Sequence, residues 1–280
     1  MRSLHGVIAC LCAFGVLAGC GESRHAQTAR AIDSVADVDL DNMAEMMLAV
    51  SDPREAVGWF RQATEQNPDR LSLQRGLARS LARSGRAEEA IPVWERVIAH
   101  DEATNEDRVQ LADAHIRASN WDEARATLDA IPPTHETYQR YRLEAMLADS
   151  REQWDRADHF YEVAAGLTPR PAGVLNNWGF SRLTRGEPRA AERLFADALR
   201  HDPTMFTAKN NLVLARAAQR RYELPVMEMT QTERAQLLHT MALAAIRQND
   251  VAVGRALLEE AIATHPQHFE PAVLALRALG

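Results

Sequence analysis

Small and large apolar residues recur along this chain at helical spacings, and the pattern returns about every 34 residues. In each copy an alanine is followed four residues later by a bulky apolar residue and three residues after that by another apolar one. The i, i+4, i+7 spacing places all three side chains on one face of a helix. Five copies, whose starts lie 34, 34, 33 and 34 residues apart, begin at Ala56, Ala90, Ala124, Ala157 and Ala191, and a sixth begins at Gly254.

The segment before each copy predicts a further helix, so the repeating unit is a pair of helices. Small residues let two helices approach closely, and the bulky residue fills the space to the next helix. A proline such as Pro68 or Pro169 follows several copies and ends the second helix, since it removes a backbone hydrogen bond. The turn between the two helices carries glycine in two units, at Gly85 and Gly186.

Period, spacing and terminal proline together resemble the tetratricopeptide repeat. The resemblance implies an all-α fold, a right-handed α-solenoid of about six to seven helix-turn-helix repeats. The expected units are 37–70, 71–104, 105–137, 138–171, 172–205, a short irregular unit at 206–233, and 235–268, with a capping helix at 269–280. The unit at 206–233 is irregular because Leu224 and Pro225 interrupt its second helix, and the capping helix would cover the last apolar face.

Composition agrees with helices. Alanine and leucine fill 48 and 29 of the 280 positions, whereas valine and isoleucine together fill 24, so an all-β or a parallel α/β core is not expected. The formal net charge of -7 gives no electrostatic reason to expect a nucleic-acid partner. An apolar content of 46% argues against a disordered chain.

The first twenty residues have the form of an export signal. Arg2 precedes an apolar run over 7–18, which is too short to span a bilayer as a helix. Leu17, Ala18, Gly19 and Cys20 then resemble the lipobox of bacterial lipoproteins, which implies a signal peptide at 1–19 and a lipid on Cys20. An ordinary signal peptide with a chance cysteine is the alternative.

On the lipoprotein reading the mature chain is anchored by its first residue. Residues 20–36 would form a flexible tether, and Gly21 favours a periplasmic position at the outer membrane by the sorting pattern of enteric bacteria. All three cysteines lie within the first twenty positions, so the rest of the chain can form neither a disulfide nor a thiolate metal site.

Residues that suggest chemistry have structural explanations. Trp121, Trp154 and Tyr222 share one repeat position and are expected to pack at the start of second helices. The spacing of His265 and His268 could suit zinc, but no third ligand is evident. No phosphate loop, nucleophile elbow or zinc-protease motif is present in the sequence. We therefore expect no enzyme activity, no metal and no cofactor.

In tetratricopeptide proteins the first helices line a concave groove. Mapping the groove positions of that family onto this chain gives an arginine-rich first half and a second half with amides and apolar residues: Arg75, Arg79, Arg83, Arg117, Arg142, Asn176, Asn177, Phe180, Asn210, Asn211 and Leu214. Arginine can clamp carboxylates and asparagine can pair with a peptide backbone, so a peptide or a partner's C-terminus could bind there. The alternative is that the arginines only solvate an exposed face and that Asn177 and Asn211 follow a common repeat preference.

Three segments narrow the resemblance further: 175–181, 208–212 and 257–269 look like the TadD proteins of Flp (Tad) pilus assembly. That resemblance implies a membrane-anchored adaptor that assists a pilus or type II-like secretion machine, with a secretin as a possible protein partner. The alternative is a lipoprotein that scaffolds peptidoglycan or outer-membrane assembly enzymes. A periplasmic metal-binding protein or enzyme is a third, weaker alternative.

Overall fold

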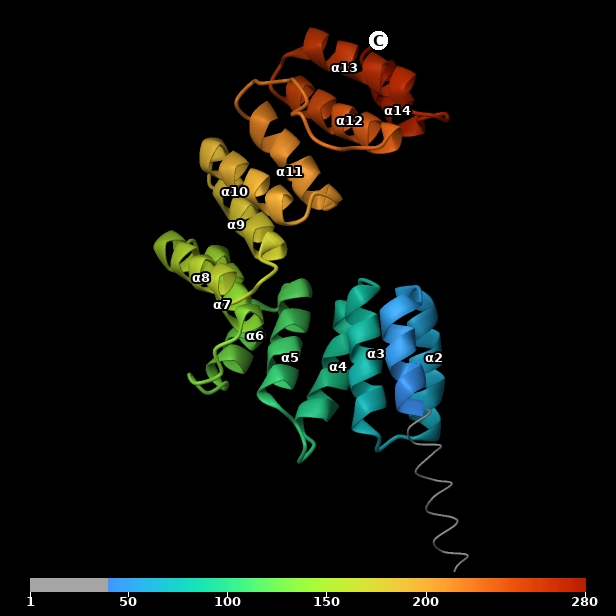
Figure 1. Ribbon diagram of the computed structural model, residues 1–280, viewed down its shortest axis with the longest axis vertical. Coiled ribbons are helices and arrows are strands. Elements are labelled where there is room, and N and C mark those ends of the chain that lie inside the picture. The colour runs from blue at the N-terminus through green and yellow to red at the C-terminus, as the bar shows by residue number, and fades with distance from the viewer. Residues whose placement is uncertain (1–39) are drawn as a thin grey trace, which may run out of the picture.

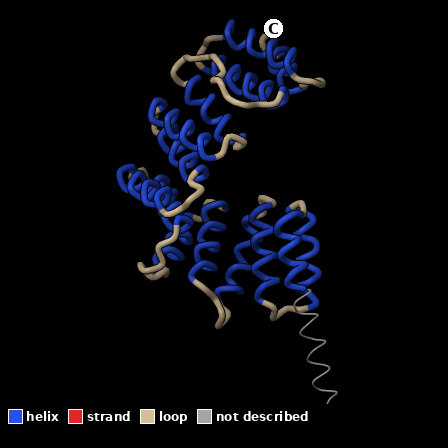
Figure 2. Tube along the Cα trace, viewed as in Figure 1, coloured by secondary structure: helices blue, strands red, loops and turns tan. Residues whose placement is uncertain are grey.

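The computed structural model describes residues 40–280; the expected signal peptide, Cys20 and tether lie outside the described residues. Every regular element of residues 40–280 is a helix, which confirms the predicted all-α solenoid (Figure 2). None of the helices in this range is long and apolar enough to cross a membrane.

A helix over 40–50 opens the described chain. It is followed by α2 (Pro53–Gln66), α3 (Leu71–Arg83), α4 (Ala87–Ile98), α5 (Asn105–Arg117), α6 (Trp121–Asp129), α7 (Tyr138–Ser150), α8 (Trp154–Gly166), α9 (Ala172–Thr184), α10 (Pro188–His201), α11 (Phe206–Ala217), α12 (Gln231–Arg247), α13 (Val251–Thr264) and α14 (Glu270–Arg277).

The helices form an elongated, open array in which the C-terminus and the first helices lie at opposite ends (Figure 1). Each helix packs on the next along the chain, and α5 also contacts α7 as α9 contacts α11. First helices of successive repeats are therefore neighbours in space, and side chains far apart in the sequence share one face of the solenoid.

The repeated bulky residues form the core of the array. Phe60, Trp94, Leu128, Tyr161, Phe195 and Leu258 are all buried. Glycine faces two of them: a Cβ atom on Gly76 would lie 2.1 Å from the Phe60 ring, and one on Gly179 would lie 2.7 Å from the Phe195 ring. These distances are far below van der Waals contact, so only glycine permits such close helix packing.

Six first helices end in the same way: α3, α5, α7, α9, α11 and α12. A residue with left-handed backbone follows each of them: Gly85, Ser119, Glu152, Gly186, Arg220 or Asn249. The next residue donates its backbone N–H five residues back, as in Arg86 to Leu81 at 2.9 Å and Arg221 to Arg216 at 3.1 Å. This bond belongs to the Schellman motif, which satisfies carbonyls at a helix end.

The sixth unit departs from the pattern after its turn. Although α11 ends in the same motif at Arg220, residues 218–230 form an extended strap without a helix. Pro225 cannot donate a backbone hydrogen bond, and it restrains Leu224 from the helical region. Helix α12 therefore packs directly on α11, and the only lysine of the chain joins them: Lys209 Nζ lies 3.1 Å from Glu233 Oε1.

Candidate peptide-binding groove

In the first half of the groove three of the mapped arginines line one cavity. Arg79, Arg83 and Arg117 border a volume of about 550 Å³ together with Leu48 and Gln110. Arg83 donates a hydrogen bond to the backbone carbonyl of Leu48, so this guanidinium is already engaged. The cavity lies between the first helices of successive units.

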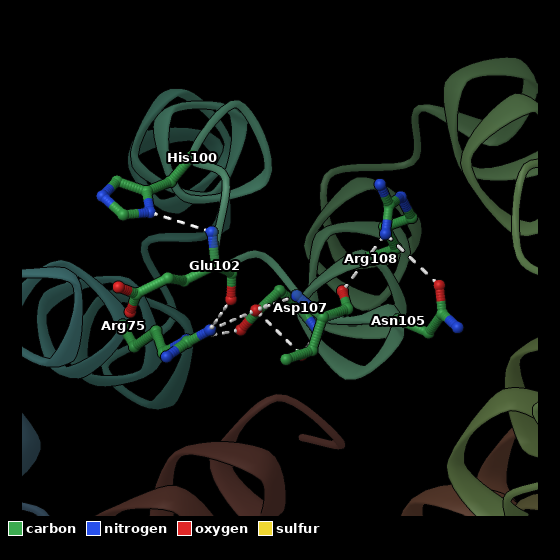
Figure 3. A network of polar contacts seen from close by, with 7 residues as sticks. Arg75, His100, Glu102, Asn105, Asp107 and Arg108 are labelled. Atoms are coloured by element: carbon green, nitrogen blue, oxygen red, sulfur yellow. Dashed lines mark hydrogen bonds and ion pairs between the residues drawn. The ribbon is translucent and has the colours of Figure 1, made fainter.

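Arg75 is committed to an internal ion pair. Its Nε and Nη2 atoms lie 2.8 Å and 2.7 Å from the two carboxylate oxygens of Asp107, and Nη2 also donates to the Glu102 carbonyl at 3.1 Å (Figure 3). Asp107 is buried at the third position of α5, where its carboxylate also accepts the Thr104 backbone N–H at 2.8 Å. The pair therefore clamps α3 to the start of α5.

The pKa of Asp107 reports this clamp. Burial alone would raise the pKa, but hydrogen bonds from Arg75 and Thr104 outweigh burial and hold the pKa below its usual value. Arg75 and Asp107 are 32 residues apart in the sequence, and counting repeat positions does not reveal their pairing.

Arg142 and Arg117 share a second internal acid. Arg142 lies 2.9 Å from Asp113, which also forms an i, i+4 pair with Arg117. Arg79, in contrast, is exposed and makes no ion pair within residues 40–280. The charged half of the groove is thus largely neutralised by its own carboxylates.

The second half of the groove contains an exposed aromatic side chain. Phe180 on α9 is 51% exposed and borders a cavity of about 530 Å³. Met146 and Tyr161 contribute further apolar surface, and Asn176, Asn177 and Asn211 add amides to the lining. An exposed ring beside a concave apolar surface is a site where a partner's apolar side chain could be buried.

The groove amides are held by single hydrogen bonds. Asn211 donates to Asn176 at 3.0 Å, Asn210 accepts from Thr240 at 2.8 Å, and Asn177 lies 3.7 Å from the Met146 sulfur. Each amide has two N–H donors and an acceptor oxygen with two lone pairs, so these contacts leave capacity for a peptide backbone. Leu214 is partly buried and packs against the last core cluster.

A second cavity extends the Phe180 site. It has a volume of about 440 Å³ and is bordered by Arg142 and Arg170. Both cavities share Asn176, Asn177 and Thr207, so the two volumes are adjacent along the groove. An elongated ligand could place an anionic group near the arginines and an apolar group on Phe180.

Sequence reasoning missed several lining residues. Met146 occupies the ninth position of its first helix, as Phe180 does, and the same position count could have found it. Arg170 lies before α9 and outside any first helix, whereas Thr207 is the second residue of α11, one turn before Asn210, and the same position count could have found it. Tyr161 belongs to a second helix, and its contribution depends on how α8 packs beneath α7 and α9.

A partly buried carboxyl group lies beside the Phe180 cavity. Asp149 accepts hydrogen bonds from Tyr161 Oη at 2.9 Å and Ser181 Oγ at 2.7 Å, which link α7, α8 and α9. Burial raises the pKa of Asp149 despite these two bonds. Burial and the neighbouring Asp149 also hold the pKa of Tyr161 well above its ordinary value.

The histidines and tryptophans singled out from the sequence make local contacts. His265 stacks on Phe269 with ring centroids 4.8 Å apart, and His268 lies 2.5 Å from Glu270. Over residues 40–280 no group of three or more histidine, cysteine or acidic side chains could hold a metal ion. Trp121 and Trp154 begin α6 and α8, whereas Tyr222 lies in the strap, where no second helix forms.

Comparison with known proteins identifies the repeat. Two family profiles, both described as tetratricopeptide repeat, match: one at residues 84–148 and the other at 47–107 and 177–224. None of the curated proteins matches the sequence. These repeats form a scaffold for protein–protein interaction, and they account for the succession of helix pairs.

Solved structures share the fold at low sequence identity. A tetratricopeptide repeat protein from Parabacteroides merdae has a TM-score of 0.55 at 12% identity, over 86% of this chain and 97% of that one. PilW, a type IV pilus biogenesis factor, has a TM-score of 0.54 at 14% identity, over 73% of this chain and 98% of that one. The APC/C hetero-tetramer Cut9–Hcn1 has a TM-score of 0.56 at 13% identity. The match covers 81% of this chain but 46% of that chain.

Proposed function

Because the chain is built from tetratricopeptide repeats, we propose that it is a non-enzymatic adaptor that binds a segment of a protein partner in the second half of its groove. The observation that carries the proposal is the half-exposed Phe180 ring beside the partly exposed amides of Asn176 and Asn177. The ring offers an apolar contact, and the amides offer hydrogen bonds to a peptide backbone.

Burial of the Phe180 ring would contribute substantially to the free energy of binding. Covering the exposed half of a phenylalanine side chain removes about 100 Å² of apolar surface from water, which favours binding by about 2.5 kcal/mol. That energy corresponds to a difference in affinity of almost two orders of magnitude. The amides would then fix the register of the bound segment.

Photocrosslinking from position 180 tests the groove. Lys209 is the only lysine and is buried, so amine-reactive crosslinkers report little on this chain. A benzoylphenylalanine in place of Phe180, produced in the native cell, should capture a protein and allow the contacted segment to be mapped. Capture of no protein by a folded, normally abundant variant would overturn the groove proposal.

A matched pair of substitutions provides the control. In affinity capture of that partner from cell extract by the tagged protein, without a crosslinker, Phe180→Asp should weaken capture by at least tenfold, because the apolar contact is lost. Leu167→Asp introduces the same charge at a side chain of similar exposure, 45%, that lies after α8. Leu167→Asp should leave capture unchanged, and equal losses in both variants would contradict a specific role for the groove.

We further propose that the partner belongs to a Flp/Tad pilus or type II-like secretion machine, with a secretin as the foremost candidate. The similarity of 175–181, 208–212 and 257–269 to TadD proteins supports this assignment. The fold shared with PilW, itself a pilus biogenesis factor, is compatible with it. Deletion of the gene should abolish surface pili, and Phe180→Asp should fail to restore them. Capture of cell-wall enzymes instead would favour the scaffold alternative.

The anchor is a separate part of the proposal. The Leu17 to Cys20 sequence supports lipidation at Cys20 and a periplasmic position at the outer membrane. Metabolic labelling with an alkyne fatty acid should label the wild-type chain and not Cys20→Ser. In the same cells Cys20→Ser should leave the membrane fraction; persistent membrane association without label would overturn the lipid anchor.

A further inference from the structure

The strap at residues 218–230 leaves a gap in the row of second helices. Its partly buried side chains Tyr222, Leu224, Met227 and Met229 pack with the last core cluster, formed by α11 to α14. Helix α10 belongs to a different cluster, built around Phe195. Figure 1 shows the strap as a loop that connects α11 to α12, whereas in every earlier unit a second helix follows the first.

A cavity remains between the strap and α10. Its volume is about 510 Å³, and its walls include Ala196 and Leu199 of α10, Leu212 of α11, and Pro225 and Met227 of the strap. We name this cavity the strap slot. The groove cavities are bordered mainly by first helices, whereas the strap slot lies on the side of the second helices.

Next to this gap, the sequence of α10 differs from that of the other second helices. In the other second helices the residue after the bulky core residue is charged and exposed: Arg61, Glu95, Asp129, Glu162 and Glu259. In α10 the corresponding residue is Ala196. The face of α10 toward the strap is therefore apolar at the position where its counterparts carry a charge.

The strap adds an apolar side chain that nothing covers. Val226 borders the slot and has a relative exposure of 107%, so it contributes nothing to the folded core. Val226, Ala196 and Leu199 border the same cavity, so together they offer a partner an apolar surface to bury.

Charges of both signs border the slot: Glu228 of the strap lines it, and arginines border an adjoining cavity that shares Glu192 with it. Glu192 forms ion pairs with Arg216 and Arg221. Arg189 and Arg193, which border an adjoining cavity, make no ion pair within the described part of the chain, and Arg193 is exposed. Acidic side chains on a bound segment would complement these two cations.

We propose that the strap slot receives an amphipathic helix of a protein partner, which takes the place of the missing second helix of the sixth repeat. Its apolar face would cover Ala196, Leu199 and Val226, and acidic residues along one edge would face Arg189 and Arg193. The neighbouring helices α10 and α13 each have 14 residues, which sets the length of helix that the row accommodates at about four turns. This surface is independent of the Phe180 groove.

A photocrosslinker at position 226 tests the slot in the native cell. It should capture a protein, and the crosslinked residues should map to an amphipathic helical segment with acidic residues. A synthetic peptide of that segment should then bind the purified protein. Crosslinks only to lipid, only to another copy of this chain, or to no molecule would overturn the proposal.

One substitution restores the charge that the other second helices carry. Ala196→Glu should weaken binding of the peptide by at least tenfold, since it places a carboxylate against the apolar face and beside acidic residues. Its matched control is Glu162→Ala in α8, which should leave binding unchanged. Leu199→Glu, with circular dichroism to verify folding, provides a second variant. Peptide binding that survives in both folded slot variants would contradict the assignment.

The two surfaces are separable by experiment. Phe180→Asp should leave peptide capture at position 226 intact, and Ala196→Glu should leave capture at position 180 intact. Crosslinking at 180 without crosslinking at 226 would reject the strap slot and retain the groove, and the reverse result would reject the groove alone.

Discussion

The two halves of the groove have the same backbone design and opposite surface chemistry. In the first half Arg75, Arg142 and Arg117 are paired with Asp107 and Asp113. In the second half the groove carries Phe180 beside amides that are held by single hydrogen bonds. The arginines of one half are thus structural clamps between repeats, whereas the other half retains unsatisfied binding capacity.

The ninth residue of the first helices shows the difference between the two halves. It is Arg79 in α3 and Asp113 in α5, then Met146 in α7, Phe180 in α9 and Leu214 in α11. The same backbone site therefore changes from charged to apolar along the solenoid. Charge in a groove is not by itself evidence of a charged ligand, because neighbouring repeats can supply the counter-charge.

The largest expected effect breaks the clamp of the first half. Arg75→Met should lower the free energy of unfolding by about 2–3 kcal/mol, because it leaves the buried Asp107 carboxylate without its cation. Arg79→Met, the same substitution on an exposed arginine of the same helix, should change it by less than about 0.5 kcal/mol. Urea unfolding followed by circular dichroism measures both, and equal losses would contradict the distinction between clamped and free arginines.

The clamp also has a pH signature. The pKa of Asp107 is lower in the folded than in the unfolded chain, so its stabilising contribution is present above pH 4 and is lost as pH falls through the folded pKa. The stability difference between wild type and Arg75→Met should therefore shrink on acidification below pH 4.

The next prediction concerns the core that the two halves share. Gly76→Ala in the first half and Gly179→Ala in the second should each cost about 2 kcal/mol, since the added methyl group meets a buried phenylalanine ring. Exposed Gly58, where a Cβ atom would meet nothing within 4 Å, is the control and should tolerate alanine. If Gly179→Ala left stability unchanged while Gly76→Ala lowered it, the second half would be packed more loosely than the first.

A smaller effect should have the opposite pH dependence. The pKa of Asp149 is raised in the folded chain, so the folded state loses stability as pH rises from the unfolded pKa, near 3.8, through the raised value. Asp149→Asn should remove this loss, raise stability by up to about 1 kcal/mol at pH 7, and leave stability near pH 3 unchanged. A stability loss at pH 7 would show that the ionised carboxylate is favourable here.

The smallest effect tests a feature common to both halves. Glu152 has a φ of 56°, in the left-handed region that glycine occupies at Gly85 and Gly186. Glu152→Gly should raise stability by about 0.5–1 kcal/mol, because glycine adopts this conformation without steric cost. Thermal unfolding should show the gain, while Gly186→Ala, the converse change, should show a loss.

The fold could be predicted from the sequence because its determinants are periodic. Ala56, Phe60 and Ala63 recur at fixed spacing, so one copy explains the others, and the all-α solenoid is confirmed. The interruption at Leu224 and Pro225 is also visible locally, since both the proline and the residue before it are restricted.

The state of the candidate site could not be predicted in the same way. Position counting selects residues for one face, but it does not indicate that Arg75 meets Asp107 across two helices or that Phe180 is left half exposed. These properties depend on side-chain length, on helix angles and on which neighbour is available. The strap slot depends on the helix that Leu224 and Pro225 interrupt, and its second sequence signal is Ala196 at a position where the other second helices carry a charge.

The most direct measurement compares the two halves at the same helical position. A synthetic peptide of the segment captured at position 180 is titrated by calorimetry against the wild-type protein, Phe180→Asp and Arg79→Glu. The account predicts at least a tenfold rise in Kd for Phe180→Asp and less than a threefold change for Arg79→Glu. A large effect of Arg79→Glu with an unchanged Kd for Phe180→Asp would place binding in the charged half and contradict the account.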